Sequence, residues 1–186
     1  MLGIYMAPDA NNVPQIQHMR KQATDWASQL NGSSISKSEA WTALHCTIPM
    51  KLKYPGPACT LTRAQCQFVM APVNKIGLTR SGITSTLPSP FRVGPITSGG
   101  AGVLDLYTDT RAGTLMYLID QIWRQTSSGS LANGIIENLV IEAGVTGLLW
   151  DYSFTLLKQW ISTDTLLLHT WEFAFNAGLA LNIHHA

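Results

Sequence analysis

The sequence predicts a mainly α-helical fold with one short N-terminal β-strand and a long loop rich in glycine and proline. Apolar residues recur at spacings of three and four along most of the chain, which is the period of a helix face. Only residues 2–7 alternate in the way typical of a strand, and residues 78–104 are rich in Gly, Pro, Ser and Thr. We therefore expect three regions, which are residues 1–78, 79–107 and 108–186.

The expected strand is the stretch LGIYMA at residues 2–7, in which Leu2, Ile4 and Met6 share one face. A single strand cannot pair with itself, and the rest of the chain offers no obvious partner strand. We expect this strand to need a sheet from elsewhere and to exchange its amide hydrogens fast in isolation.

Three helices are expected in the first region, and a capping box formed by Thr62 and Gln65 starts the third of them. Pro49 and Pro72 fall inside the second and third helical patterns, where a proline is expected to kink, interrupt or end a helix. The helices are expected at about residues 14–30, 33–54 and 62–77, with apolar faces formed by Ile16, Met19, Ala23, Trp26 and Leu30, then Trp41, Leu44, Ile48 and Leu52, then Cys66, Val69, Met70, Val73 and Ile76.

The strongest amphipathic signal in the chain lies in residues 115–123, where five apolar residues follow a helical period. This segment is expected to form part of the main core, with the indole of Trp123 buried. After a break at TSSGS, residues 131–144 are expected to form a helix with Leu131, Ile135 and Leu139 aligned. Helices at about residues 152–161 and 164–177 are then expected to bury Phe154, Leu157, Trp160, Leu167, Trp171 and Phe175.

Charge is distributed unevenly along the chain. Residues 1–100 contain nine Lys or Arg and three Asp or Glu, whereas residues 101–186 contain three and eight. A basic half of this kind is expected to contact a polyanion, and the alternative is ordinary solvated charge. The candidate nucleic-acid-binding residues are Arg20, Lys21, Lys51, Lys53, Arg63, Lys75, Arg80 and Arg92. We expect about three to five of them to reach the phosphates of one duplex, which gives a salt slope of about −3 to −5.

The sequence offers no catalytic residues and no metal ligands. The cysteines Cys46, Cys59 and Cys66 form no CxxC pair and are expected to be buried reduced thiols of an intracellular protein. His184 and His185 lie at an unpatterned end, no G-x-S-x-G motif occurs, and the aspartates lack the paired spacing that two magnesium ions need. No run of 18 apolar residues occurs, so no membrane span is expected.

The stretch PITSGGAGVLDLYTDT at residues 95–110 is typical of a loop that binds phosphate, but neither phosphate-binding motif fits it. A P-loop ends in Gly-Lys-Ser/Thr, whereas Gly102 is followed by Val103. A dinucleotide fingerprint needs a third glycine where Asp105 stands. We therefore expect Gly99, Gly100 and Gly102 to be structural, and direct phosphate contact through their N–H groups is the alternative.

The order of these elements resembles the region after the palm in reverse transcriptases of non-LTR retrotransposons. The resemblance is carried over residues 1–110 by LGIYMAPD, by a helix ending WASQL, by AWTALHCTIPMKLKYPGPACTLT, by MAPVNKIGL and by GGAGVLDLYT. In that family a helix ends in Leu-x-Tyr, which matches Leu52 and Tyr54, and a Gly-Gly-x-Gly-hydrophobic motif follows, which matches residues 99–103. The tail beyond residue 110 matches less specifically.

The resemblance implies a thumb and connector fragment of an RNA-directed DNA polymerase that grips the template–primer duplex of RNA and DNA. The catalytic aspartates of that family lie upstream in the palm, so this chain is expected to be inactive alone and to need no cofactor of its own, since magnesium would belong to the missing palm. Its expected partners are the duplex and the upstream fingers and palm of the same polyprotein, with no membrane. The alternatives are a helical protein-interaction module with no nucleic-acid role, and an enzyme whose site the sequence does not reveal.

Overall fold

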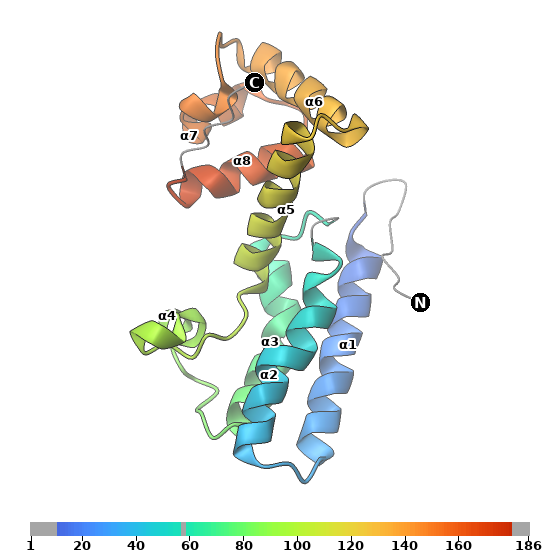
Figure 1. Cartoon of the computed structure of the whole chain (residues 1–186), viewed down its shortest axis with the longest axis vertical. Coiled ribbons are helices and arrows are strands. Elements are labelled where there is room, and N and C mark those ends of the chain that lie inside the picture. The colour runs from blue at the N-terminus through green and yellow to red at the C-terminus, as the bar shows by residue number, and fades with distance from the viewer. Residues whose placement is uncertain (1–10, 57–58, 180–186) are drawn as a thin grey trace. The chain divides into compact units, whose positions relative to one another are not determined.

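Figure 1 shows the computed structural model of the chain, which describes residues 11–56 and 59–179. The described residues are mainly helical and contain no β-strand, so the predicted mainly α-helical class is confirmed. The expected strand at residues 2–7 lies outside the described residues. The chain divides into two compact units, Met1–Thr110 and Arg111–Ala186.

Three long helices form the first unit and lie side by side (Figure 1). They are α1 (Val13–Gly32), α2 (Lys37–Lys53) and α3 (Arg63–Arg80). The predicted apolar faces point inward and build one core, in which only Trp41 and Ile76 are partly rather than fully buried. Burial of these faces, more than helix propensity, stabilises helices of this length in water.

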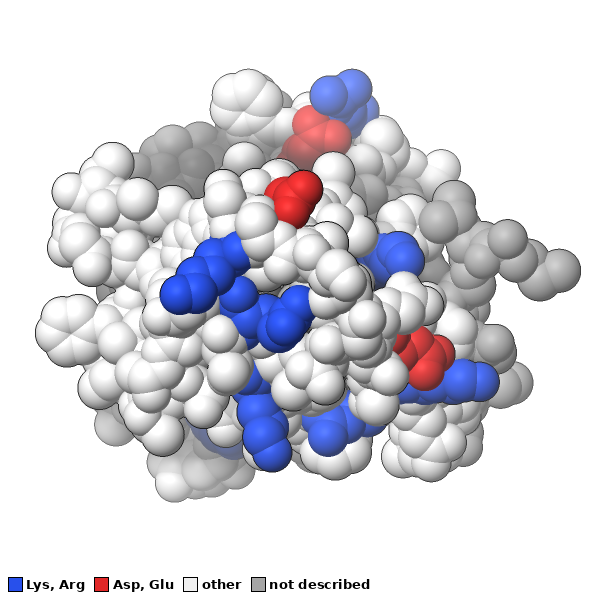
Figure 2. All heavy atoms as spheres, turned by 90° about the horizontal axis from the view of Figure 1, so that it is seen from below, with Lys and Arg blue, Asp and Glu red and all other residues white. Residues whose placement is uncertain are grey.

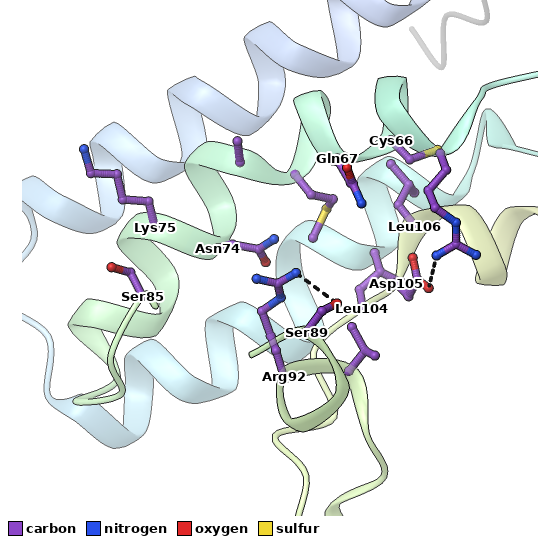
Figure 3. A pocket seen from close by; sticks show the side chains of 14 residues that line it. Cys66, Gln67, Asn74, Lys75, Ser85, Ser89, Arg92, Leu104, Asp105 and Leu106 are labelled. Carbon is purple, nitrogen blue, oxygen red and sulfur yellow. Dashed lines mark hydrogen bonds and ion pairs between the residues drawn. The ribbon is translucent and has the colours of Figure 1, made fainter. Parts of the chain in front are cut away.

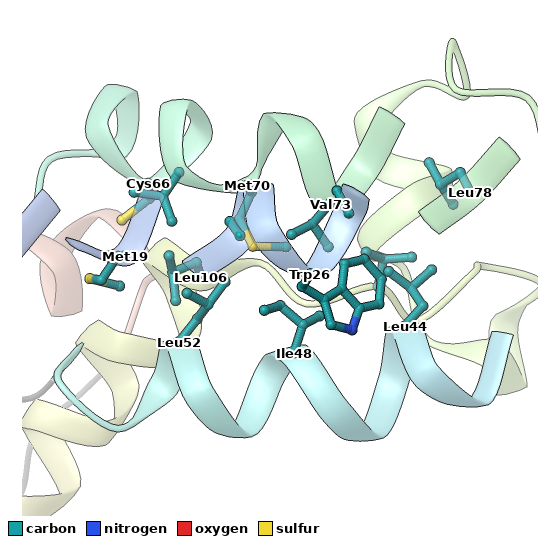
Figure 4. Packing of buried hydrophobic residues seen from close by; sticks show 14 of the residues in the cluster. Met19, Trp26, Leu44, Ile48, Leu52, Cys66, Met70, Val73, Leu78 and Leu106 are labelled. Carbon is teal, nitrogen blue, oxygen red and sulfur yellow. The ribbon is translucent and has the colours of Figure 1, made fainter. Parts of the chain in front are cut away.

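The three helices come close together at Gly77. Figure 4 shows the indole of Trp26 from α1 beside Leu44 and Ile48 from α2. A Cβ atom at Gly77 of α3 would lie 2.7 Å from Leu44 Cδ1 and 3.3 Å from the Trp26 ring, which is too close for the first of these contacts. The missing side chain therefore leaves the space that the leucine and the indole occupy.

Both α2 and α3 begin with a capping box. The predicted pair closes in both directions, because Gln65 N donates to Thr62 Oγ1 at 3.2 Å and Thr62 N donates to Gln65 Oε1 at 2.8 Å. Ser36 and Glu39 do the same for α2, with Ser36 N donating to Glu39 Oε2 at 2.7 Å. These bonds satisfy backbone N–H groups that have no partner inside the helix.

Pro49 and Pro72 neither end nor interrupt their helices, so the expectation of a stop or an interruption at these prolines is wrong. Helix α2 continues past Pro49 to Lys53, and α3 continues past Pro72 to Arg80. An internal proline costs a helix about 3 kcal/mol or more. The buried faces on both sides of each proline offset that cost, because Ile48 and Leu52, like Val69 and Val73, are fully buried.

The loop expected at residues 79–107 contains short regular pieces. Helix α4 (Ser89–Val93) and the 3-10 turn η2 (Ile96–Ser98) interrupt it, and α5 (Leu106–Trp123) begins at its end. Pro88 and Pro95 precede the two short pieces, where their restricted φ suits a helix start.

The second unit has its own small core. Trp171 is its largest buried side chain, at 1% exposure, and it meets Phe154 edge to face with 5.0 Å between ring centroids. Ile122, Leu139 and Leu149 belong to the same cluster. The elements of this unit after α5 are α6 (Ser127–Ala143), η3 (Leu149–Asp151), α7 (Phe154–Leu157), η4 (Lys158–Trp160) and α8 (Leu166–Asn176).

Three aromatic side chains expected in the core are exposed instead. Trp123 is 77% exposed, Trp160 65% and Phe175 39%. Each residue turns a helix by about 100°, so Trp123 lies at the edge of the stripe that is centred on Leu115 and Ile122. Trp160 lies in the 3-10 turn η4, because the helix expected at residues 152–161 is only two short pieces.

A break separates α5 from α6 as expected, but it covers residues 124–126, and most of the segment TSSGS belongs to α6. Thr126 Oγ1 accepts a hydrogen bond from Gly129 N at 3.1 Å, which caps α6 at Ser127. A Cβ atom at Gly129 would lie 2.1 Å from Gln121 O, so only glycine lets α6 pack this closely on the end of α5. Leu131, which was expected to share the apolar face of α6, is exposed.

The contrast between the buried Trp171 and the exposed Trp123 is testable. We expect Trp171→Ala to lower the free energy of unfolding by about 3–5 kcal/mol, because it empties a buried site. Trp123→Ala should change it by no more than about 0.5 kcal/mol. Urea denaturation followed by circular dichroism measures both, and equal losses would contradict the assignment of Trp123 to the surface.

Glu142 holds the segment before α8 against α6. Its carboxylate accepts hydrogen bonds from Ser162 N at 3.2 Å, from Thr163 N at 3.3 Å and from the Thr163 hydroxyl. These donors favour the charged form and lower the pKa of Glu142 below its ordinary value, with the Thr163 hydroxyl as the largest cause. A lowered pKa in the folded state stabilises the fold only while the carboxylate is charged.

Stability should therefore depend on pH at this position. The contribution of Glu142 is fully present above its unfolded pKa of about 4.5 and is lost as the pH falls through its lower folded pKa. We expect Glu142→Gln to be less stable than the wild type at neutral pH and to lose less stability on acidification. Thermal unfolding between about pH 7 and 3 measures this, with the exposed Glu137→Gln as the control. Identical slopes for the wild type and Glu142→Gln would contradict it.

Candidate nucleic-acid interface

The first unit is basic and the second is acidic. Residues 1–110 contain nine Lys or Arg and five Asp or Glu, and residues 111–186 contain three and six. Figure 2 shows one face of the molecule on which Lys and Arg predominate over Asp and Glu. An electrostatic surface for a polyanion is therefore to be sought in the first unit.

A groove of about 450 Å³ runs along α3 and brings three of the eight candidate cations together. We call it the α3 groove. Its cations are Arg63, Lys75 and Arg92, and among the described residues Asp105 is the only acidic one that lines it. The other lining residues are drawn in Figure 3, where most of them are labelled, and they are Cys66, Gln67, Met70, Ala71, Asn74, Ser85, Ser89, Val93, Leu104 and Leu106.

The floor of the groove is one face of α3. Positions 63, 67, 71 and 75 follow one another at intervals of four, so Arg63, Gln67, Ala71 and Lys75 share a stripe on the helix. At 1.5 Å per residue this stripe is about 18 Å long. It spans about five phosphates of one nucleic-acid strand, which repeat about every 3.4 Å along a duplex axis.

The opposite wall comes from the segment after α3 and from α4. Arg92 Nη2 donates a weak hydrogen bond to Ser89 Oγ at 3.4 Å, and its side chain points toward Asn74 (Figure 3). Asn74 Oδ1 is buried and has no hydrogen-bond partner among the described residues. Serine, asparagine and glutamine side chains contact phosphate and sugar oxygens in protein–DNA complexes, so they suit a groove for a backbone.

Arg63 lies at one end of the groove, and its interactions with neighbouring side chains are weak. Its guanidinium stacks over the Tyr107 ring at 4.6 Å and lies 3.9 Å from Asp105 Oδ2. The Arg63 side chain remains 60% exposed. An exposed ion pair contributes about 0–1 kcal/mol, so a phosphate can compete with Asp105 for this arginine.

Arg20 lies outside the groove, and its guanidinium bonds to the backbone of α3. Pro72 has no N–H, so the carbonyl of Phe68, four residues earlier in α3, lacks its helical donor. The Arg20 guanidinium donates to Phe68 O and stacks over the Phe68 ring at 4.5 Å. This arginine joins α1 to α3 at the carbonyl that the proline leaves without a partner.

The remaining candidate cations are also outside the groove. Arg80 Nη2 donates to Ser33 O at 2.5 Å, and Lys53 Nζ lies 3.2 Å from Asp109 Oδ1. Lys21 on α1 and Lys51 on α2 are exposed but line neither the α3 groove nor the smaller recess beside it. The structure therefore gathers Arg63, Lys75 and Arg92 and disperses the other five.

The glycine loop folds back onto α4 rather than forming an open cradle. Gly102 N donates to Gly94 O at 2.8 Å, Gly100 N to Pro95 O at 2.9 Å and Gly99 N to Ile96 O at 3.1 Å. The N–H groups of all three glycines are thus used within the loop. Gly99 and Gly102 have φ of 80° and 60°, where residues with a side chain are strained.

Position 100 requires glycine because the backbone of Gly94 lies very close to it, and not because of a positive φ. A Cβ atom at this position would lie 2.1 Å from Gly94 O and would push the outgoing and returning segments of the loop apart. Ala101 N and Val103 N donate to Phe91 O and Arg92 O at 2.7 and 2.9 Å, so the returning loop holds α4, and with it Arg92, in place.

The polar residues of the groove were missed from sequence. Gln67, Asn74, Ser85, Ser89 and Asp105 carry no motif and were not expected to lie near the cations. The interval of four between Arg63, Gln67, Ala71 and Lys75 is a signal that could have found the floor. Nothing in the sequence indicates that α4 returns to cover it.

Cysteine burial agrees with expectation at two of the three positions. Cys59 and Cys66 are buried and free, whereas Cys46 is exposed. Burial raises the pKa of the Cys59 thiol. Within residues 11–56 and 59–179 no three His, Cys, Asp or Glu side chains come together in a way that could hold a metal ion, and no helix there is long and apolar enough to cross a membrane. His184 and His185 lie outside the described residues.

The chain matches no known family model, and no curated protein or solved structure is similar enough to count as a relative. The resemblance to reverse transcriptases therefore stays a prediction. The geometry of the α3 groove has to carry the functional argument.

Proposed function

We propose that this chain is a non-catalytic helical module that holds a nucleic-acid duplex by its phosphate backbone, with the α3 groove as the contact surface. The supporting observation is that Arg63, Lys75 and Arg92 line one groove, in which Asp105 is the single carboxylate within the described part of the chain. Arg63 and Lys75 stand at the two ends of a stripe about 18 Å long, which spans about five phosphates of one strand.

The composition of the groove also favours backbone contacts without sequence preference. Its neutral polar groups come from α3, from the segment after it and from α4, and α3 already uses its other face to build the core. Phosphate contacts position a protein on a duplex but do not distinguish base pairs. Binding should therefore be weak, of micromolar order at physiological salt, and indifferent to sequence.

The order of elements supports a more specific proposal, in which the module is the thumb and connector fragment of a non-LTR reverse transcriptase. Its ligand would then be the template–primer duplex of RNA and DNA, and the palm of the same polyprotein would hold the catalytic aspartates and their magnesium. In this proposal the fragment itself binds the duplex and catalyses no reaction.

Reversing the charge of the groove should abolish most of this binding. We expect Lys75→Glu combined with Arg92→Glu to weaken binding of an RNA–DNA hybrid about tenfold or more, because two favourable contacts become repulsive. Fluorescence anisotropy at low salt measures this. Lys21→Glu combined with Lys51→Glu is the matched control, since it makes the same change of net charge outside the groove and should weaken binding less.

The dependence on salt gives a second readout of the same experiment. Three cations in contact predict a slope of about −3 for log K against log salt in the wild type, the shallow end of the range expected from sequence. The groove variant should have a flatter slope. Equal losses in the groove and control variants would contradict the assignment of the site, and no binding by a folded wild-type sample at low salt would remove the nucleic-acid proposal.

Removing the one carboxylate of the groove should have the opposite effect. We expect Asp105→Asn to strengthen binding about threefold, because it frees Arg63 from an exposed ion pair and removes repulsion from the phosphates. Asp109→Asn removes the same charge four residues later, where the carboxylate pairs with Lys53 outside the α3 groove. The same anisotropy titration compares the two variants, and tighter binding by Asp109→Asn than by Asp105→Asn would count against the groove.

A protein-interaction module is the second candidate function. The observation that favours it is that Met116 and Trp123 of α5, which are seven residues apart and share a helix face, are both exposed in the second unit. A failure of the anisotropy experiment on folded protein would make this the preferred proposal.

A further inference from the structure

His45 places both of its ring nitrogens against carbonyl oxygens. Nδ1 lies 3.0 Å from Trp41 O within α2, and Nε2 lies 3.0 Å from Ala101 O in the glycine loop. A carbonyl oxygen only accepts hydrogen bonds, whereas a neutral imidazole has one N–H and one nitrogen with a lone pair. Both contacts are hydrogen bonds only when the ring carries a proton on each nitrogen.

We propose that protonated His45 holds the glycine loop on α2 and so sets the wall of the α3 groove, which makes phosphate binding stronger as the pH falls. The effect on binding rests on the function proposed above, whereas the effect on the loop does not. An imidazole gains its second ring proton only as the pH falls, so a pair of contacts that needs both ring protons depends on pH.

The loop connects His45 to the groove through shared residues. His45 lines a recess of about 360 Å³, and Val93, Leu104 and Asp105 line both this recess and the α3 groove. The hydrogen bond from Val103 N to Arg92 O, two residues after Ala101, ties the same loop to a cation of the groove. A shift of the loop away from His45 therefore moves a wall of the groove and Arg92.

Other charged groups near His45 are engaged with one another. The recess also contains Lys53 and Asp109, which form an ion pair at 3.2 Å, while Asp105 faces Arg63 at 3.9 Å. The Trp41 ring lies 4.2 Å from the imidazole, centroid to centroid. No ion pair joins His45 to a carboxylate within the described part of the chain. The ring is therefore held by two carbonyl oxygens, and its proton decides whether both bonds exist.

Hydrogen exchange tests the loop without any nucleic acid. We expect the amides of Ala101, Gly102 and Val103 to be about tenfold better protected at about pH 5.5 than at about pH 8, after correction for intrinsic exchange, which is the effect of one hydrogen bond from a charged donor. His45→Phe keeps a ring but no donor and should lose this difference. His18→Phe, on α1, is the control and should keep it.

Protection of these amides that is independent of pH in the wild type, or that stays pH-dependent in His45→Phe, would overturn the proposal. If His45→Phe does not fold, the pH dependence of exchange in the wild type alone decides whether the proposal stands. The ¹⁵N spectrum of the ring should show two protonated nitrogens at the pH where the loop is protected, and a neutral ring under that condition overturns the proposal.

Anisotropy with the RNA–DNA hybrid at the same two pH values tests the link to binding. We expect the wild type and His18→Phe to bind several-fold more tightly at the lower pH, and His45→Phe to show a smaller difference. Equal pH dependence in the wild type and His45→Phe would overturn the link. Absence of binding at both pH values would overturn the proposed function and the link together, while the exchange data would still decide whether His45 holds the loop.

Discussion

The close packing of α1 against α3 is the constraint on which the first unit depends. Near the C-terminal end of α3, Gly77 leaves room for Trp26 and Leu44. Nearer its N-terminal end, Pro72 leaves the Phe68 carbonyl without a helical donor, and Arg20 fills that need from α1. Two residues that ordinarily weaken a helix thus define where its neighbours lie. Since this packing buries one face of α3, the opposite face is free to form the groove.

The helical elements of the first unit could be predicted because their signals are local. A capping box depends on residues three positions apart, and Thr62 and Gln65 form it as expected. Apolar spacing selected the buried faces of α1, α2 and α3 almost completely. The helices continue past the two prolines because the cost of a proline is local while the burial that offsets it is tertiary, as the neighbours Ile48 and Val73 show.

The groove and the second unit were harder to predict for a different reason. The number of charged residues indicates that the first half of the chain is basic, but it does not distinguish one arginine from another. Arg20 and Arg80 donate to backbone carbonyls. Arg63 and Arg92 instead line the groove. Whether an arginine bonds to a carbonyl or lines the groove depends on which helix packs beside it. The spacing of residues along the sequence does not indicate this. The exposure of Trp123 has another origin, since the turn of about 100° per residue places this side chain at the edge of the apolar stripe of α5.

The three-helix arrangement also bears on the speed of folding. Helix α1 packs most extensively on α3, although the whole of α2 lies between them in sequence. Closing that longer segment costs more loop entropy before the contacts form, so this core should fold more slowly than one in which only neighbouring helices pack. The glycine loop instead pairs Ala101 with Phe91 and rests on an already formed α2. The groove should accordingly be completed last, after the helices that carry its floor have assembled.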